Sequence, residues 1–185
     1  MSHATKIILE QSLKELLLTK PLNKITISDL TEAAGISRMT FYYHFQDIYE
    51  LIEWTCQHDA QKALKGKKTY DTWQEGMLNI FNAVLANKPF VMNVYNSISR
   101  EQIENYLFTL VYNLLYDVVN ELAQGKNVST NDQEKIAHFY KYAFVGIMLD
   151  WVKSGMKQKP EDLVVHLSIM IHGSMEKSVN NFAKN

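Results

Sequence analysis

Apolar residues recur along the chain at the three-to-four-residue spacing of amphipathic helices. The first such stripe predicts a helix over about 5–19, which Lys20-Pro21 ends, and it consists of Leu9, Leu13, Leu16 and Leu17. The chain has three prolines and seven glycines in 185 residues, too few for a turn-rich β fold. The pattern therefore predicts an all-α protein.

A series of capping signals between residues 26 and 47 divides the next stretch into short helices. Thr26 with Asp29 three positions later is typical of a capping box, and Gly35 supplies the left-handed residue that ends the short helix it opens. Ser37 caps a third helix that begins at Arg38 and ends near 45–46. Asp47 then caps a longer helix that runs into 65–68. A turn of three residues between the second and third helices predicts a helix-turn-helix.

The remaining helices are longer. We expect a helix over 71–87 capped by Asp71, a short segment opened by Lys88-Pro89, a long helix from Ser99 to about 123, a helix from Thr130 or Asn131 to 154–155, and a last helix from Pro160 nearly to the end. These elements predict a three-helix domain over 1–50, a connecting helix and boundary over 51–68, and a helical domain over 69–185.

The third helix carries a cluster of aromatic residues, and a helical wheel separates them into two groups. Phe41 and Phe45 share one face, which can pack against the first two helices. The opposite face, free for another use, carries Met39, Thr40 and Tyr43, while Tyr42 and His44 lie on the two flanks.

A helix-turn-helix inserts the exposed face of its second helix into the major groove of DNA. Thr40 and Tyr43 can hydrogen-bond to base edges, and Met39 offers an apolar contact. Arg38, Tyr42 and His44 are placed to contact the DNA backbone. We also assign Thr26 and Ser37, at the starts of the second and third helices, to the DNA-binding set.

The same residues resemble a known family. The stretch Ile25-Thr26-Ile-Ser-Asp-Leu30, followed by Ala34-Gly35-Ile36-Ser37 and Thr40-Phe41-Tyr42-Tyr43-His44-Phe45, is similar to the DNA-binding domain of TetR/AcrR-type transcriptional regulators. Two positions depart from the family pattern: Met39 replaces a small residue, and Ile48 replaces a lysine that contacts phosphate. The resemblance implies a DNA-binding regulator, while the departures imply a base preference of its own.

The C-terminal part is rich in aromatic residues and methionine, and we expect each of these to pack in the core. They are Trp73, Phe81, Phe90, Met92, Tyr95, Tyr106, Phe108, Tyr112, Tyr116, Phe139, Tyr142, Phe144, Met148 and Trp151. The family resemblance implies a ligand pocket among these helices. Residues 143–156 with Pro160-Glu161 also resemble the C-terminal domain of regulators of dihydroxyacetone kinase operons, some of which act with a protein coactivator.

The family resemblance also implies that the last two helices form a four-helix dimer interface. Small and apolar residues there permit the close approach of helices. The candidate interface residues are Ala143, Gly146, Ile147, Asp150, Ile169 and Gly173. Two recognition helices related by such a dimer can read a palindromic operator.

Charge and composition narrow the remaining functions. The net charge is −1, so a nucleic-acid site must be local. The single cysteine, Cys56, excludes an internal disulfide, and no apolar run is long enough for a membrane span, so we expect a cytoplasmic protein with no membrane partner. His166 and His172 lie on different helix faces, and no phosphate loop, metalloprotease motif or nucleophile elbow is present. We expect no metal, no cofactor and no enzymatic activity.

The sequence thus predicts a homodimeric TetR-like regulator, with repression favoured over activation. Its DNA partner is a palindromic operator, and release is controlled by a small-molecule or protein effector at the C-terminal domain. Two alternatives stay open: a coactivator-dependent activator, and a helical protein-interaction module whose DNA-binding head has degenerated.

Overall fold

The structure, a computed structural model, describes residues 2–67, 69–171 and 173–183. Within these ranges the chain is helical and contains no strand, so the predicted all-α fold is confirmed. The elements are α1 Ser2–Leu16, η1 Leu22–Lys24, α2 Ile27–Ala33, α3 Arg38–His44, α4 Ile48–Leu64, α5 Trp73–Ala86, α6 Lys88–Ser97, α7 Arg100–Ala123, α8 Thr130–Lys153, α9 Pro160–Ile171 and α10 Ser174–Phe182. Lys68 and His172, which figured in the predictions, lie outside the described residues.

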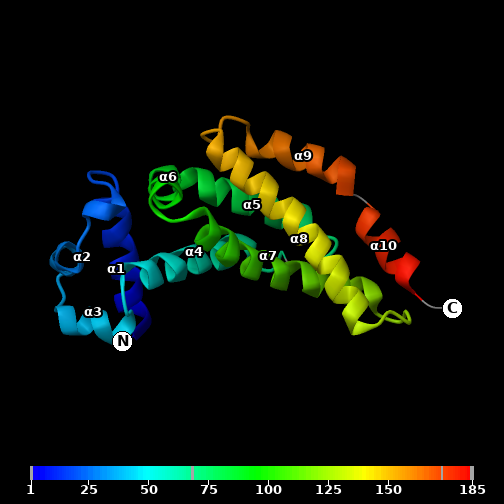
Figure 1. Cartoon of the computed structure of the whole chain (residues 1–185), viewed down its shortest axis with the longest axis horizontal. Helices are drawn as coiled ribbons and strands as arrows, with labels where there is room; N and C mark the ends of the chain where they lie inside the picture. Colours follow the sequence, from blue (N-terminus) through cyan, green and yellow to red (C-terminus); the bar gives the residue numbers. More distant parts are fainter. Residues whose placement is uncertain (1, 68, 172, 184–185) are drawn as a thin grey trace.

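The molecule is elongated, and α1–α3 form a small head at one end of its long axis (Figure 1). Helix α4 leads out of the head toward the larger helical part, where α7 and α8 pack along each other (Figure 1). Helix α9 begins near the middle of the long axis and runs away from the head, and α10 and the loop between α7 and α8 lie at the far end (Figure 1). The head and the larger part are therefore joined mainly by α4, with α6 close to the head as well.

The caps predicted for the head are confirmed. The Thr26 side chain accepts a hydrogen bond from the Asp29 amide, and the Asp29 carboxylate accepts one from the Thr26 amide, which completes the capping box. Ser37 accepts from the Thr40 amide, and Asp47 accepts from the Glu50 amide. Each cap satisfies an amide that the first helical turn leaves without a partner, so the turns between the helices are fixed.

Several predicted boundaries are wrong, each for a local reason. Helix α1 ends at Leu16, because residues 17–20 continue as tighter turns. The cap residue of α5 is Thr72, which makes no side-chain cap, and the predicted cap Asp71 lies before it. The cap of α8 is Ser129, which accepts from the Asp132 amide, rather than Thr130 or Asn131.

The predicted last helix is two helices. Gly173, the N-cap residue of α10, adopts a left-handed conformation with φ of 71°. The chain therefore changes direction between α9 and α10. The apolar pattern of the sequence continues across this break, which is why the pattern alone did not reveal it.

Three hydrophobic clusters form the core. The first unites the head, with Leu9, Leu13 and Phe41 fully buried, and it includes Phe90 of α6. The other two surround α8 on its inner sides. The prediction that each C-terminal aromatic residue is buried is wrong for Phe139 and Tyr142, which are exposed on α8.

Candidate nucleic-acid interface and ligand cavity

Helix α3 packs against the core of the head through its two phenylalanines. Phe41 has no exposed surface and Phe45 almost none, and their ring centroids lie 6.0 Å apart in the head cluster. The predicted inward direction of both side chains is confirmed. Because this contact fixes the rotation of α3 about its axis, it also fixes which side chains face solvent.

The opposite face of α3 is open. The side chains of Met39 and Tyr43 are 79% and 81% exposed, and Tyr42 on the flank is exposed as well. Thr40 is half-buried, and its hydroxyl lies 2.9 Å from the Ser37 hydroxyl. Large apolar and aromatic side chains seldom stand so far into water without a partner, which marks this face as a contact surface.

Three of the other predicted DNA-binding residues already contact neighbouring side chains. The guanidinium of Arg38 donates to the Ser28 hydroxyl of α2, and the Thr26 hydroxyl donates to Asp29 at 2.8 Å. The His44 ring lies edge-on to the Tyr43 ring at 5.0 Å. All eight residues lie on α3 or at the starts of α2 and α3, so the structure brings the predicted set together.

The capping box is electrostatically reinforced. The Lys20 ammonium lies 2.9 Å from the Asp29 carboxylate. Hydrogen bonds from Lys20 and then from the Thr26 amide and hydroxyl lower the pKa of Asp29 to about 2. The carboxylate therefore stays charged throughout the neutral range and holds the N-terminus of α2.

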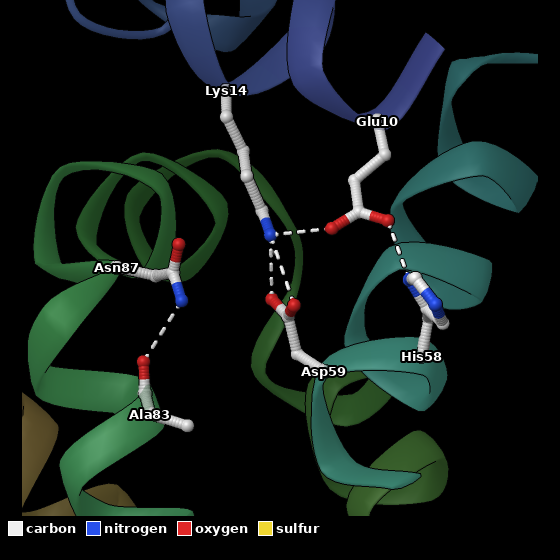
Figure 2. A network of polar contacts seen from close by, with 6 residues as sticks. All are labelled: Glu10, Lys14, His58, Asp59, Ala83 and Asn87. Carbon is white, nitrogen blue, oxygen red and sulfur yellow. Dashed lines mark hydrogen bonds and ion pairs between the residues drawn. The ribbon is translucent and has the colours of Figure 1, made fainter. Parts of the chain in front are cut away.

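A polar junction that sequence reasoning missed joins the head to α4. The Lys14 ammonium of α1 lies 2.7 Å from Glu10 and contacts both carboxylate oxygens of Asp59 of α4 at 2.8 and 3.0 Å. The second Glu10 oxygen lies 2.6 Å from Nδ1 of His58 (Figure 2). Glu10 is almost fully buried. We call Glu10, Lys14, His58 and Asp59 the Lys14 junction.

The Lys14 junction sets the charge state of its buried acid. Burial alone pushes the pKa of Glu10 upward, but hydrogen bonds from Lys14 and His58, and their charges, together hold it below its ordinary value. The Lys14 pKa is raised, because its two carboxylate partners outweigh its own burial. Glu10 and Lys14 are therefore both charged at neutral pH, and they bind α1 to α4.

Helix α6 also contacts the head. The Phe90 ring lies 5.8 Å below the Lys14 ammonium, and the Asn93 side-chain amide donates to the Leu17 carbonyl at 3.1 Å. Lys14 thus meets residues of α1, α4 and α6 at one place.

A cavity of about 620 Å³ lies between α4, α5, α6, α7 and α8. Its wall is mostly aliphatic and aromatic, and both Asp59 and Phe90 contribute to it. The volume lies in the range of sites that enclose small organic molecules. The cavity therefore shares two wall residues with the contacts around Lys14.

The predicted dimer residues have two kinds of environment. Ala143 and Asp150 of α8 and Ile169 of α9 are exposed, whereas Gly146, Ile147 and Gly173 are half-buried. Sequence reasoning missed further exposed apolar side chains on the same two helices, namely Phe139, Tyr142, Val165 and Met170. Their helical spacing could have suggested this face, but the same spacing is typical of a core stripe.

Comparison with known proteins places both parts of the chain. Residues 11–54 match the family described as bacterial regulatory proteins of the tetR family, and residues 71–173 match one described as a transcriptional regulator C-terminal region. The chain belongs to the TetR family of transcriptional regulators. This agrees with the prediction that it is a DNA-binding regulator and no enzyme.

Individual relatives of the TetR family extend the match along the chain. The HTH-type dhaKLM operon transcriptional activator DhaS of Lactococcus lactis is 25% identical over 131 residues, which cover 71% of this chain and 69% of that protein. A solved structure of the dihydroxyacetone kinase operon activator DhaS has a TM-score of 0.71 and 21% identity, and covers 97% of this chain and 98% of that one.

Two repressors, one of them described as a TetR family repressor, share the fold at lower identity. The structure of AlkX from Dietzia sp., implicated in biodegradation of n-alkanes, has a TM-score of 0.56 at 15% identity and covers 94% of this chain and 96% of its own. NalD, the secondary repressor of the MexAB-OprM multidrug efflux pump in Pseudomonas aeruginosa, has a TM-score of 0.60 at 13% identity and covers 100% and 98%. In the part of the chain that the structure describes, no helix is both long and apolar enough to cross a membrane.

Proposed function

We propose that this TetR-family regulator binds a palindromic operator as a homodimer, acts as a repressor, and releases DNA when an effector occupies the cavity. The observation that carries the proposal is the open face of α3, where Met39 and Tyr43 face solvent above a buried Phe41. In this division residues 1–50 bind DNA, residues 51–68 connect, and residues 69–185 bind the effector and the second subunit.

The proposed contacts follow from the orientation of α3. Met39, Thr40 and Tyr43 meet base edges in the major groove, because they share the exposed face. Arg38, Tyr42 and His44 flank that face and contact the backbone, together with Thr26 and Ser37 near the helix N-termini. Residues 1–68, which include the head and α4, carry nine Lys and Arg against eight Asp and Glu, so these local contacts supply the attraction rather than a basic field.

The proposed dimer pairs the exposed faces of α8 and α9 with those of a second copy. Exposed Phe139, Tyr142, Val165 and Ile169 on this side would otherwise remain in water. Small residues such as Ala143 and Gly146 on α8 allow two helices to approach closely. A two-fold axis here places two copies of α3 for half-sites about one DNA turn apart, about 34 Å.

The proposed effector response runs from the cavity to the head through the contacts of Lys14. Asp59 and Phe90 line the cavity and both contact Lys14, which belongs to α1 of the head. A ligand that separates α4 from α6 therefore shifts α1 and α3 as one body. A difference of about 1–3 kcal/mol between the two states is enough to change operator affinity severalfold.

Activation is the second candidate. It is favoured by the relative of Lactococcus lactis, which is described as a transcriptional activator. A reporter gene under the control of the protein's operator distinguishes repression from activation. Lower expression in the presence of the protein supports repression, and higher expression supports activation.

A salt titration tests DNA binding itself. The full-length protein is titrated against random duplex DNA at low and at moderate salt, with fluorescence anisotropy as the readout. Phosphate contacts release counterions, so affinity falls steeply as salt rises. Weak binding with no dependence on salt would instead identify a helical protein-interaction module.

A further inference from the structure

The charged side chains on the cavity wall are unequally partnered. The wall includes the charged residues Glu53, Asp59 and Lys67. Asp59 is neutralised by Lys14 through both of its oxygens, and Lys67 lies 2.6 Å from the Glu75 carboxylate. Among the described residues no ion pair or hydrogen bond engages the carboxylate of Glu53. Glu53 is exposed, so its carboxylate lies on the wall at the side that solvent reaches, and the one cation of the described wall, Lys67, is already paired.

A buried hydroxyl faces the same part of the cavity. The Tyr106 hydroxyl of α7 is inaccessible to solvent and has no hydrogen-bond partner among the described residues. Burial, followed by the nearby Cys56, Glu53 and Asp59, raises the pKa of Tyr106, so the phenol stays neutral. A buried hydroxyl without a partner is costly in a folded protein. Its position on the wall gives a ligand a hydrogen-bonding group to engage.

The remaining wall favours a hydrophobic body for that ligand. The aromatic rings on the wall include Trp73 and Phe81 of α5, Phe90 and Tyr95 of α6, and Phe144 of α8. The thiol of Cys56 lies with Glu53 on the cavity face of α4, and burial, with Asp59, raises its pKa to about 12. The thiol is therefore uncharged at neutral pH, and Glu53 is the charge that distinguishes this end of the cavity.

We infer that the cavity binds an amphipathic cation, with its apolar body among the aromatic rings and its ammonium group at Glu53 and Tyr106. The inference deepens the proposed function, because it rests on the cavity being the effector site. An anionic ligand would bring a second negative charge next to Glu53 and find no unpaired cation on the described wall. An ammonium group can donate one hydrogen to Glu53 and another to the Tyr106 oxygen.

A series of probes with one chain and three head groups tests the inference. Decylamine, decanol and decanoate are titrated into the full-length protein at neutral pH by calorimetry, below their aggregation concentrations. Decylamine should bind about fivefold or more tightly than decanol, because only its ammonium group can form a partly exposed ion pair with Glu53. Decanoate should bind most weakly. Equal binding of decylamine and decanol, tighter binding of decanoate, or no binding of any probe would overturn the inference.

Two variants locate the head group. E53Q should remove the preference for decylamine over decanol, whereas E134Q, the same change at an exposed position outside the cavity wall, should keep it. Tyr106→Phe should weaken decylamine severalfold. A preference that survives E53Q would overturn the assignment of Glu53.

Operator release is measured separately with the same probes. If decylamine binds through Glu53 and the operator stays bound, the effector role in the proposed function fails and the ligand class stands. If decanol or decanoate releases the operator as well as decylamine does, the cavity remains the effector site and the inferred ligand class fails.

Discussion

Replacing Lys14 with methionine removes the cation that holds Glu10 and Asp59 together across the boundary between α1 and α4. The methionine keeps most of the aliphatic chain, so packing beside Phe90 changes little. What is lost is the cation that pairs with both carboxylates, one of which is deeply buried. The expected result is a less stable head whose position relative to α4 is less well fixed.

The structure sets the size of this effect. The side chains of Lys14 and Asp59 are 22% and 21% exposed, and that of Glu10 is 5% exposed. Removing one partner of a fully buried pair costs about 3–5 kcal/mol, and an exposed pair contributes about 0–1 kcal/mol. Lys14 lies between these limits, so Lys14→Met should lower the free energy of unfolding by about 2–3 kcal/mol.

The effect should depend on pH in a definite direction. The pKa of Glu10 is below its ordinary value of 4.5 in the folded protein, so its stabilisation is present above pH 4.5 and is lost as pH falls through the folded pKa. The raised pKa of Lys14 adds stabilisation that is present below pH 10.5 and is lost as pH rises through the folded pKa. The difference between wild type and Lys14→Met should therefore be greatest at neutral pH and shrink in acid.

Urea unfolding at a fixed protein concentration, at neutral pH and again below pH 4.5, measures this difference. Lys62→Met is the matched control, because Lys62 is exposed on α4 and the charge change is the same. A loss below about 1 kcal/mol for Lys14→Met would refute the reasoning, as would an equal loss for the control.

Three other predictions test the rest of the structure. Phe41→Ala should destabilise the head by about 3–5 kcal/mol in urea unfolding, whereas Tyr43→Ala should change stability by less than about 0.5 kcal/mol and weaken operator binding about fivefold or more in an anisotropy titration. Gly76→Ala should cost about 1–3 kcal/mol, since its methyl group would collide with the Lys67 carbonyl; a thermal melt unchanged from wild type would contradict that contact. Ile169→Asp should yield folded monomers in light scattering, and a persistent dimer would exclude this face of α9 from the interface.

Sequence reasoning succeeded where a structural signal lies within one helical turn. The caps at Thr26, Ser37 and Asp47 each involve an amide three residues onward, so the pattern contains both partners. It failed at Ser129, because four consecutive capping residues compete there and only the chain path decides among them. The outward and inward faces of α3 were predictable, because Phe41 and Phe45 lie four residues apart on one side.

Contacts between distant segments could not be predicted. Lys14 and Asp59 are 45 residues apart, and nothing in the spacing of either residue indicates the other. Phe139 and Tyr142 posed a different problem, since an apolar stripe has the same spacing whether it covers a core or awaits a second subunit. The proximity of Glu53 of α4 to the Tyr106 hydroxyl of α7 on the cavity wall was likewise visible only once the two helices were placed together.

Selection of bound duplexes from a random pool tests the account most directly. The full-length protein and Tyr43→Ala are each used to enrich DNA under moderate salt, and the enriched sequences are compared. The account predicts that wild type enriches an inverted repeat with half-sites about one helical turn apart, and that Tyr43→Ala enriches it weakly or loses preference at specific base pairs. No enriched sequence for wild type, or the same repeat enriched equally by Tyr43→Ala, would contradict the claim that the exposed face of α3 reads the operator.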